Sequence, residues 1–321
     1  MKVYKKLIFI ILLLIILLAT LSIIYFYNYN DLKNDYDSLV DQRNDLLIID
    51  KEEYKDNVIK YANAVQVASL YYPDHFIYYG KGGIQFKSLN KDYFQNDYHK
   101  KESVNNFISS NNKLIYNDDN TTSSFGIDIS EHQNDIDWDL LVKQGVDYVF
   151  IRVGYRGYAS GEIHLDDMFV DHISNANRVN IPVGVYFFSG AINEFEALEE
   201  ANFVLENIKD YNVELEIAFD MEEILSSSNR MKNLSNEERT HITKVFLDTV
   251  KSFGYEPVLY GNSKWLMDYL NYQDLLDYPI WFANYSGFSW PYQVLYYQYT
   301  ESLNIDGIKG KVDGNIKFIK K

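Results

Sequence analysis

Two carboxylic acids stand two residues apart at the end of an apolar run. The run 217–219 leads directly into Asp220, and Glu222 follows Met221. On a strand, residues i and i+2 share a face, and their Cα atoms lie about 6.6 Å apart at a rise of about 3.3 Å per residue. Two ionised carboxylates at that spacing repel each other, so one of them keeps a proton at neutral pH. Cleavage of a glycosidic bond needs such a proton donor with a negative partner.

The Asp-x-Glu spacing also has a structural interpretation, because a strand that turns polar as it leaves a core gives the same pattern. Asp128 follows Gly126-Ile127 on the first expected strand and Asp313 follows Lys311-Val312 on the last, and each alone fits a turn or capping residue. Together the four carboxylates predict a negative cleft that orients a neutral sugar or holds a metal. The six histidines show no metal-ligand spacing, and the sequence has no oxygen-rich loop typical of Ca²⁺ or Mg²⁺ sites. We therefore predict no metal site and no cofactor.

The elements that must position these acids follow from the pattern of residues 125–321. Short apolar runs alternate with amphipathic segments, which indicates parallel strands joined by helices. We expect strands at 125–130, 147–153, 182–189, 214–220, 256–260, 279–285, 294–300 and 312–319. We expect helices at 138–144, 166–180, 194–209 and 236–253, the last opening with a capping box of Ser235 and Glu238. Eight strands indicate an α/β barrel, irregular towards its end because no helices join the last three strands.

In such barrels the chemistry gathers at the C-terminal ends of the strands. Several polar and aromatic residues are expected there besides the acids. Aromatic rings offer flat faces for stacking on sugars and polar edges for hydrogen bonds. The candidate substrate-binding residues are Arg152, Tyr155, Tyr186, Tyr260, Trp281, Asn284 and Gln298.

Composition narrows the class of function. The chain has 321 residues, enough for one large domain or two modest ones. Its 46 acidic and 30 basic residues give a net charge of -16, which argues against nucleic-acid binding, since that binding depends on contacts to phosphates. It has no cysteine, which excludes disulfides and thiolate chemistry and fits an exported protein.

The N-terminus predicts a membrane anchor. In residues 7–27 only Thr20 and Ser22 are polar, and a helix of this length spans the roughly 30 Å hydrocarbon core. Lysines in residues 1–6 keep that short tail cytoplasmic by the positive-inside rule. A cleaved signal peptide is the alternative, although its apolar region should be shorter and end at a better cleavage site. We expect a single-pass protein of the cell membrane with its catalytic domain extracellular.

Three further segments complete the expected organisation. Residues 28–116 begin with a short heptad pattern and continue into an aromatic-rich region with a turn signal at Gly80–Gly83, which predicts a helical stalk or a small α+β region. Residues 117–124 are polar throughout and are expected to form a linker. Residues 125–321 are the expected barrel domain.

The barrel residues resemble glycoside hydrolase family 25, the Chalaropsis-type lysozymes. The resemblance lies in a collinear series of motifs at strand positions: Phe125-Gly126-Ile127-Asp128-Ile129-Ser130, Phe150-Ile151-Arg152-Val153-Gly154-Tyr155, Pro182-Val183-Gly184-Val185-Tyr186, Phe219-Asp220-Met221-Glu222, Trp281-Phe282-Ala283-Asn284, Gln298-Tyr299 and Val312-Asp313-Gly314-Asn315. It covers 125–321. Two departures concern substrate stacking: Tyr297 stands where the family often has Trp, and Gly154-Tyr155-Arg156 replaces the run found in other branches.

The resemblance implies an N-acetylmuramidase on an irregular TIM-like (β/α)5(β)3 barrel. It assigns the general acid to Glu222, its partner to Asp220, and the flanking carboxylates to Asp128 and Asp313. The nucleophile implied is the 2-acetamido group of the substrate, oriented by Asp220, and a protein carboxylate is the alternative.

The expected function is cleavage of the β-1,4 bond between N-acetylmuramic acid and N-acetylglucosamine in the glycan strand of peptidoglycan, with the enzyme tethered to the membrane for local wall remodelling. A catalytically weak wall-binding scaffold is the alternative. So is a component of a secretion, conjugation or division complex in the cell envelope, joined through residues 28–116.

Overall fold

The structure is a computed structural model that describes part of the chain. The described residues fall in two compact units, 1–89 and 90–321. They are residues 18, 20–22, 25–26, 28–33, 64–72, 74–90, 103–110 and 112–321.

The first unit contains a helix and a hairpin. Helix α3 (Ala64–Tyr71) precedes the antiparallel strands β1 (His75–Gly80) and β2 (Gly83–Ser88). The hairpin turns at the glycines where the sequence predicted a turn, and Gly82 has a φ of 89°, a conformation that favours glycine. Ala68, Ile77 and Ile84 form a small buried cluster between the helix and the hairpin.

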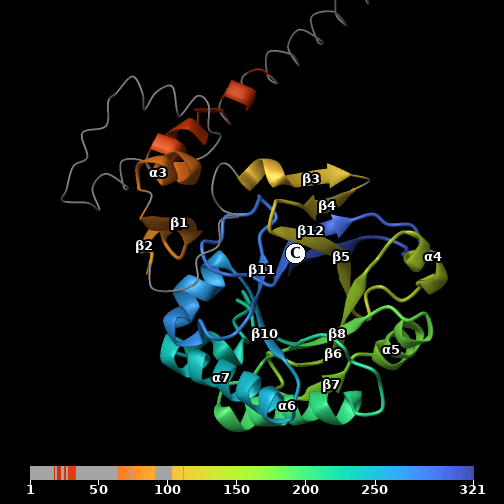
Figure 1. The fold of residues 1–321 in the computed structure, drawn as a ribbon. Coiled ribbons are helices and arrows are strands. Elements are labelled where there is room, and N and C mark those ends of the chain that lie inside the picture. Colours follow the sequence, from red (N-terminus) through yellow and green to blue (C-terminus); the bar gives the residue numbers. More distant parts are fainter. Residues whose placement is uncertain are drawn as a thin grey trace, which may run out of the picture. The chain divides into compact units, whose positions relative to one another are not determined.

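Eight strands of the second unit close into a barrel, which confirms the predicted α/β barrel (Figure 1). Each strand pairs with the next in chain order, the first seven are parallel, and the last is antiparallel to both of its neighbours. The barrel strands are β5 (Thr121–Ile129), β6 (Tyr148–Arg156), β8 (Val183–Phe188), β9 (Ile217–Asp220), β10 (Pro257–Asn262), β11 (Ile280–Ala283), β12 (Tyr296–Leu303) and β13 (Val312–Lys320).

Four α-helices lie outside the ring of strands (Figure 1). The capping box of the last one is confirmed, since Ser235 Oγ accepts from the Glu238 N–H and Glu238 Oε2 accepts from the Ser235 N–H. Residues 276–311, all described, contain no helix, which is the predicted irregularity. The helices are α4 (Trp138–Lys143), α5 (Phe169–Arg178), α6 (Glu194–Ile208) and α7 (Asn236–Ser252), and the π-helical turn η3 (Trp265–Tyr269) and 3-10 turn η4 (Tyr272–Leu275) follow β10.

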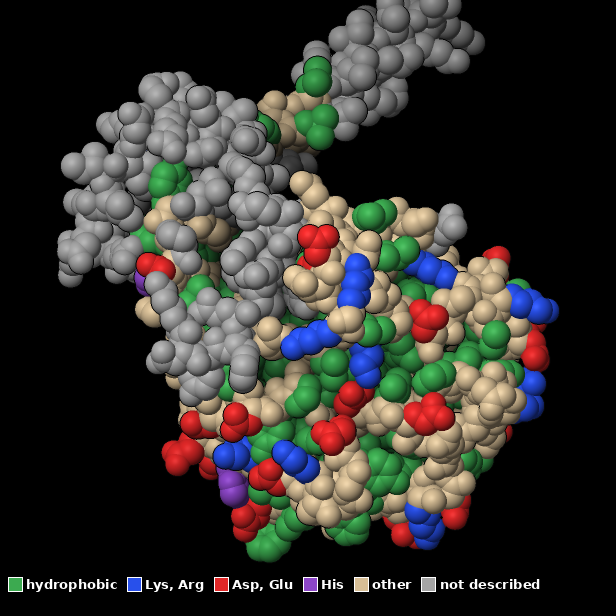
Figure 2. Space-filling model, viewed as in Figure 1, with side chains coloured by type: hydrophobic (Ala, Val, Ile, Leu, Met, Phe, Trp, Pro, Cys, Tyr) green, Lys and Arg blue, Asp and Glu red, His purple; other side chains and the backbone are tan. Residues whose placement is uncertain are grey.

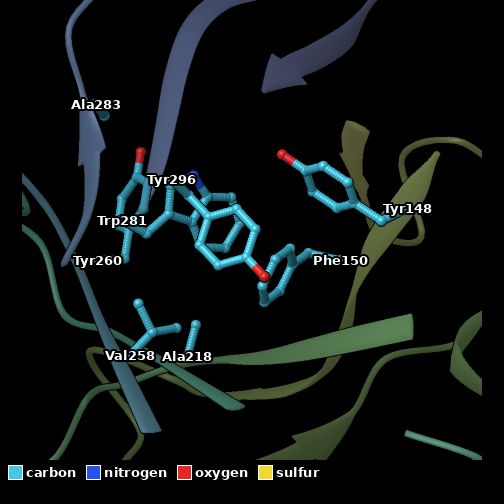
Figure 3. Packing of buried hydrophobic residues seen from close by; sticks show 8 residues of the cluster. All are labelled: Tyr148, Phe150, Ala218, Val258, Tyr260, Trp281, Ala283 and Tyr296. Atoms are coloured by element: carbon cyan, nitrogen blue, oxygen red, sulfur yellow. The ribbon is translucent and has the colours of Figure 1, made fainter. Parts of the chain in front are cut away.

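Inward-facing side chains of the strands fill much of the interior of the barrel (Figure 3). Glycine makes room for two of the rings: a Cβ at Gly126 would lie 2.3 Å from the ring of Tyr148, and one at Gly184 would lie 2.5 Å from the ring of Phe150. This packing leaves a cleft at the C-terminal ends of the parallel strands, which is lined in part by Tyr260 and Trp281. The members of the cluster are Tyr148, Phe150, Ala218, Val258, Tyr260, Trp281, Ala283 and Tyr296.

The predicted linker at 117–124 needs correction. Residues Thr121 to Ser124 form the first part of β5 and pair with Lys320 to Lys317 of β13, so their backbone groups gain partners that a polar run does not reveal. Before them, the turn η1 (Ser103–Asn106) and the strands β3 (Phe107–Ser110) and β4 (Lys113–Tyr116) belong to the barrel unit rather than to a separate stalk.

The β3–β4 hairpin is anchored to the barrel by aromatic side chains. Phe107 packs against Phe288 and Phe318 with ring centroids 5.6 and 6.3 Å apart. Tyr116 is fully buried and lies 5.4 Å from Phe318. The compact unit therefore extends to the N-terminal side of the predicted barrel domain.

Within the part of the chain that the structure describes, none of the helices has the length and apolar character needed to cross a bilayer. The tail predicted at 1–6 and most of the span predicted at 7–27 lie outside the described residues. Residues 18, 20–22, 25–26 and 28–33 are helical.

Candidate active site

The acid pair lies where the sequence placed it. Asp220 is the last residue of β9, faces the interior and is 7% exposed, and Glu222 lies just beyond the strand. Burial raises the pKa of Asp220 well above its usual value, and the charge of Glu222 and a hydrogen bond with it raise it further. Burial also raises the pKa of Glu222, whereas its hydrogen bond with Asp220 lowers it, so the proton of the pair lies on Asp220 in the absence of substrate. Two acids that share one proton in this way provide a proton donor at neutral pH.

A second carboxyl pair faces the first across the cleft. Asp128 of β5 and Asp313 of β13 are direct partners in the antiparallel register. Burial raises the pKa of Asp128, although donors from two amides oppose the shift. Burial, the charge of Asp128 and a hydrogen bond to it raise the pKa of Asp313 to about 9.

Two buried amides connect this second pair to the barrel wall. Gln298 Nε2 donates to Asp128 Oδ2 at 2.9 Å and to Asp313 Oδ2 at 3.2 Å, while its Oε1 accepts from the hydroxyl groups of Tyr260 and Tyr285. Asn315 Nδ2 donates to Asp128 Oδ2 at 2.7 Å. The two carboxyls are therefore held rigidly by donors from β12 and β13.

Arg152 brings a positive charge to the cleft. Its Nε donates to Asp166 Oδ2 at 2.7 Å, and its Nη2 lies 3.0 Å from Glu131 Oε1. The fully buried carboxylate of Asp166 also accepts from the backbone N–H groups of Glu131 and Met168. Arg152 is thus fixed by groups that lie after β5 and β7 (Ile163–Leu165).

These side chains surround a cavity of about 150 Å³, which has room for several water molecules or part of a sugar ring. The structure brings together all four predicted carboxylates and five of the seven predicted substrate-binding residues. The lining consists of Asp128, Arg152, Tyr186, Phe188, Asp220, Glu222, Tyr260, Trp281, Gln298 and Asp313.

Two predicted substrate-binding residues lie outside this lining. Tyr155 stacks on His164 of β7 with ring centroids 5.1 Å apart and supports Arg152, whose guanidinium lies 5.3 Å from the ring. Asn284 holds the loop after β11, because its Nδ2 donates to Ser289 Oγ and its Oδ1 accepts from the Ser286 N–H. Both support the cleft without lining it.

Tyr297, the departure noted at a stacking position, points away from the cleft. Its ring packs against Phe288 at 5.0 Å, and its hydroxyl donates to the backbone oxygen of Asn284. The neighbouring residues Tyr296 and Gln298 face the interior, as strand alternation requires. A change of residue type at 297 therefore acts on the outer packing of the barrel.

Sequence reasoning assigned no role to Asn315 or Asp166. Asn315 had a usable signal, since it stands two residues after Asp313 on the same strand and therefore on the same face. Asp166 had none, because only the folded chain shows that it meets Arg152.

An irregular α/β barrel with paired, buried carboxylic acids at the edge where its parallel strands end and the antiparallel β13 begins is typical of barrel-fold glycoside hydrolases. Comparison of the sequence with known protein families identifies one family within this class. The model of glycosyl hydrolases family 25 matches residues 127–308, and the chain belongs to this family.

The similar proteins include an autolytic lysozyme, an autolysin and a spore cortex lytic enzyme. An autolytic lysozyme of Clostridium acetobutylicum is 25% identical over 191 residues, which cover 59% of this chain and 54% of the relative. The modular autolysin LytC of Streptococcus pneumoniae, solved with a synthetic peptidoglycan ligand, matches with a TM-score of 0.57 and 25% identity over 77% of this chain and 57% of LytC. The spore cortex lytic enzyme SleM of Clostridium perfringens, with a TM-score of 0.53 and 21% identity over 61% of this chain and 67% of its own, shares the fold.

The chain spans about half the length of the curated relative and of LytC. Family and fold are therefore shared, whereas the activities of the complete relatives do not transfer to this chain by similarity alone.

Proposed function

We propose that the chain is an N-acetylmuramidase that hydrolyses the β-1,4 bond between N-acetylmuramic acid and N-acetylglucosamine in peptidoglycan. The observation that carries the proposal is the contact between Asp220 and Glu222, whose pKa values are both raised by burial in a cleft. Glu222 takes the proton that it shares with Asp220 and passes it to the leaving oxygen, which leaves Asp220 ionised. A catalytically weak scaffold has no need of a buried proton donor, so the pair argues against that alternative.

The geometry favours the acetamido group of the substrate as the nucleophile. Asp220 and Glu222 share a hydrogen bond, whereas a carboxylate nucleophile and its acid stand on either side of the scissile bond. Asp220 Oδ1 is buried and has no hydrogen-bond partner among the described residues. A buried acceptor without a donor is unfavourable, so this oxygen is suited to accept the N–H of a 2-acetamido group. Asp220 then orients that group for attack on the anomeric carbon.

The experiment is hydrolysis of purified peptidoglycan by the full chain, with the new reducing ends identified by mass spectrometry. We expect reducing N-acetylmuramic acid. The Glu222→Gln variant should fold and bind glycan while its turnover falls at least about 10²-fold, because an amide cannot donate the required proton. The Glu223→Gln variant is the matched control, since Glu223 instead bonds Lys264 and Tyr269. Reducing N-acetylglucosamine, or full turnover by Glu222→Gln, would contradict the proposal.

We further propose that residues 7–27 anchor the enzyme in the cell membrane with the barrel outside. The described helical residues of this region carry large apolar side chains that are more than half exposed, among them Leu18, Tyr25 and Phe26. Exposed apolar side chains on a helix suit an apolar environment. Membrane fractionation of cells tests the anchor: we expect the full chain in the membrane fraction, and a shorter, freely released protein would indicate a cleaved signal peptide.

Tethering raises the local concentration of the enzyme at the wall without any added contact. We expect the full chain to act better on intact cells than a chain that begins at Asn90, while the two act equally on purified peptidoglycan. Figure 2 shows acidic and basic side chains interspersed on one face of the barrel unit, so this face offers no single-signed patch that would replace the tether. Equal activity on cells would show that tethering is unimportant for access to the wall.

A further inference from the structure

The orientation of the Asn315 side chain is fixed by its neighbour. Trp281 Nε1 donates to Asn315 Oδ1 at 2.8 Å, and an indole nitrogen can only donate. The oxygen of the amide must therefore face Trp281, and its NH₂ group must face Asp128. Asn315 is fully buried, so no solvent competes for either contact.

The donors around the second carboxyl pair are unequally divided. Asp128 Oδ2 accepts from Asn315 at 2.7 Å and from Gln298 at 2.9 Å. Asp313 accepts from Gln298 alone among these amides, at 3.2 Å. Donors stabilise the ionised form of a carboxyl, so the negative charge belongs on Asp128 and the proton on Asp313.

We propose that Asn315, oriented by Trp281, is a positioning residue that keeps Asp128 ionised and leaves the proton of the Asp128/Asp313 pair on Asp313. The protonated Asp313 donates to Asp128, and the raised pKa of Asp313, about 9, agrees with this assignment. The importance of this arrangement for hydrolysis rests on the proposed function, but the position of the proton does not.

The other titratable groups around the pair do not reverse this order. Those that act on the pair are all acids or phenols, and Arg152, a cation in the same cleft, is already paired with Asp166 and Glu131. Glu301 and Glu222 act on Asp313 and favour its protonated form. The groups that interact with one or both carboxyls are Tyr148, Tyr186, Asp220, Glu222, Tyr260, Tyr285 and Glu301.

The experiment is a pH titration of the full chain labelled with ¹³C at the aspartate carboxyls and followed by NMR without substrate. The Asp128→Asn and Asp313→Asn variants assign the two signals. We expect Asp128 to be ionised at neutral pH and Asp313 to titrate near pH 9. The opposite order, with Asp128 holding the proton, would overturn the proposal.

The Asn315→Leu variant removes the donor, and we expect the titration of Asp128 to move up by about one pH unit, the shift that loss of one hydrogen bond to a charged group produces. Asn177→Leu is the matched control, because its amide bonds Asn212 on the outside of the barrel. If Asn315→Leu does not fold, Trp281→Phe keeps a ring, frees the amide to turn and should move Asp128 in the same direction. An unmoved Asp128 in the variant that folds would overturn the assignment.

The rate of hydrolysis provides a separate readout. The acid limb of the pH profile should move with Asp128 in Asn315→Leu, and Asn177→Leu should leave it in place. If the NMR shift occurs in a chain with no hydrolytic activity, the proposed function fails while the assignment of the proton stands.

Discussion

Asp220 and Glu222 should titrate as a pair, with consequences for the pH dependence of catalysis. In the wild type the second carboxyl of the pair must lose its proton next to a carboxylate that is already ionised, which raises its pKa. The basic limb of the rate profile therefore lies at high pH. The Asp220→Asn variant removes that charge, and we expect the basic limb to move to lower pH. Initial rates on peptidoglycan across the pH range measure it. A basic limb that stays in place would show that the two acids titrate independently.

Asp313 also links pH to stability. Its pKa is raised to about 9 in the folded protein, whereas an unfolded chain loses this proton near the usual value of an aspartate. Between these values the native state binds more protons, so this group lowers the free energy of unfolding as pH rises, by up to about 1.4 kcal/mol per pH unit.

We expect Asp313→Asn to lose this contribution and therefore to gain stability over the wild type as pH rises towards about 9. Urea unfolding at a series of pH values measures the difference. The exposed residue Asp171 provides the control variant Asp171→Asn, which should follow the wild-type curve. Parallel curves for wild type and Asp313→Asn would contradict the expectation.

Asp128, Asp220 and Glu222 could be predicted from the sequence because they lie at or just beyond an apolar run, and the C-terminal ends of parallel barrel strands converge. Asp313 reaches the same edge because it stands at the beginning of β13, which runs antiparallel. Asn315 could not be given its role in this way. The direction of its amide depends on Trp281, 34 residues away in the chain, and no local pattern encodes which end of an amide faces which partner. The sequence thus predicts which residue types lie at strand ends, whereas tertiary contacts decide which atom of an amide donates to one partner and which accepts from the other.

Arg156 joins three elements near the cleft. Its Nε donates to Glu200 of α6, its Nη1 to the backbone oxygen of Gly161, and Ser189 Oγ after β8 donates to the same glutamate. Glu200 is fully buried, and burial raises its pKa to about 7 against the effect of these hydrogen bonds. The ends of β6 and β8 are therefore fixed to α6 by a single charged group.

We expect Arg156→Met to cost about 3 to 5 kcal/mol of unfolding free energy at slightly alkaline pH, because it leaves the buried Glu200 without its partner. The cost should shrink in acid, where Glu200 is protonated. Arg178→Met is the matched control, since Arg178 pairs with Asp139 on the surface and such pairs contribute less than about 1 kcal/mol. Urea unfolding compares them, and equal losses would refute the structural role of the buried pair.

The barrel elements were largely predictable, because hydrophobic runs and amphipathic segments alternate with a clear period. β7 was not, since its three residues are partly or fully exposed and lack an apolar run. The sequence also did not show that β13 is antiparallel to its neighbours, because the alternation of side chains along a strand is the same in parallel and antiparallel pairing. The polar residues 121–124 become strand only through their pairing with β13.

The two compact units make a prediction for the whole molecule. A chain that begins at Asn90 should keep the thermal stability of the barrel, whereas one that begins at Phe125 lacks β3, β4 and the first part of β5. Loss of the half-buried ring of Phe107 and the fully buried ring of Tyr116 should lower the free energy of unfolding by at least about 3 kcal/mol. Calorimetry of both chains measures this, and equal melting temperatures would show that the hairpin is dispensable.

The pairing of β13 with β5 has a consequence for the order of assembly. Asn315 and Asp128 are 187 residues apart in the chain, and they meet only when the last strand closes the ring. Contacts between such distant residues form late, since a long loop must close first. On a ribosome or during passage through a translocation channel, β5 emerges long before its partner. A growing chain therefore carries Asp220 and Glu222 without the opposite wall of the cleft, and hydrolysis is withheld until synthesis has passed Asn315.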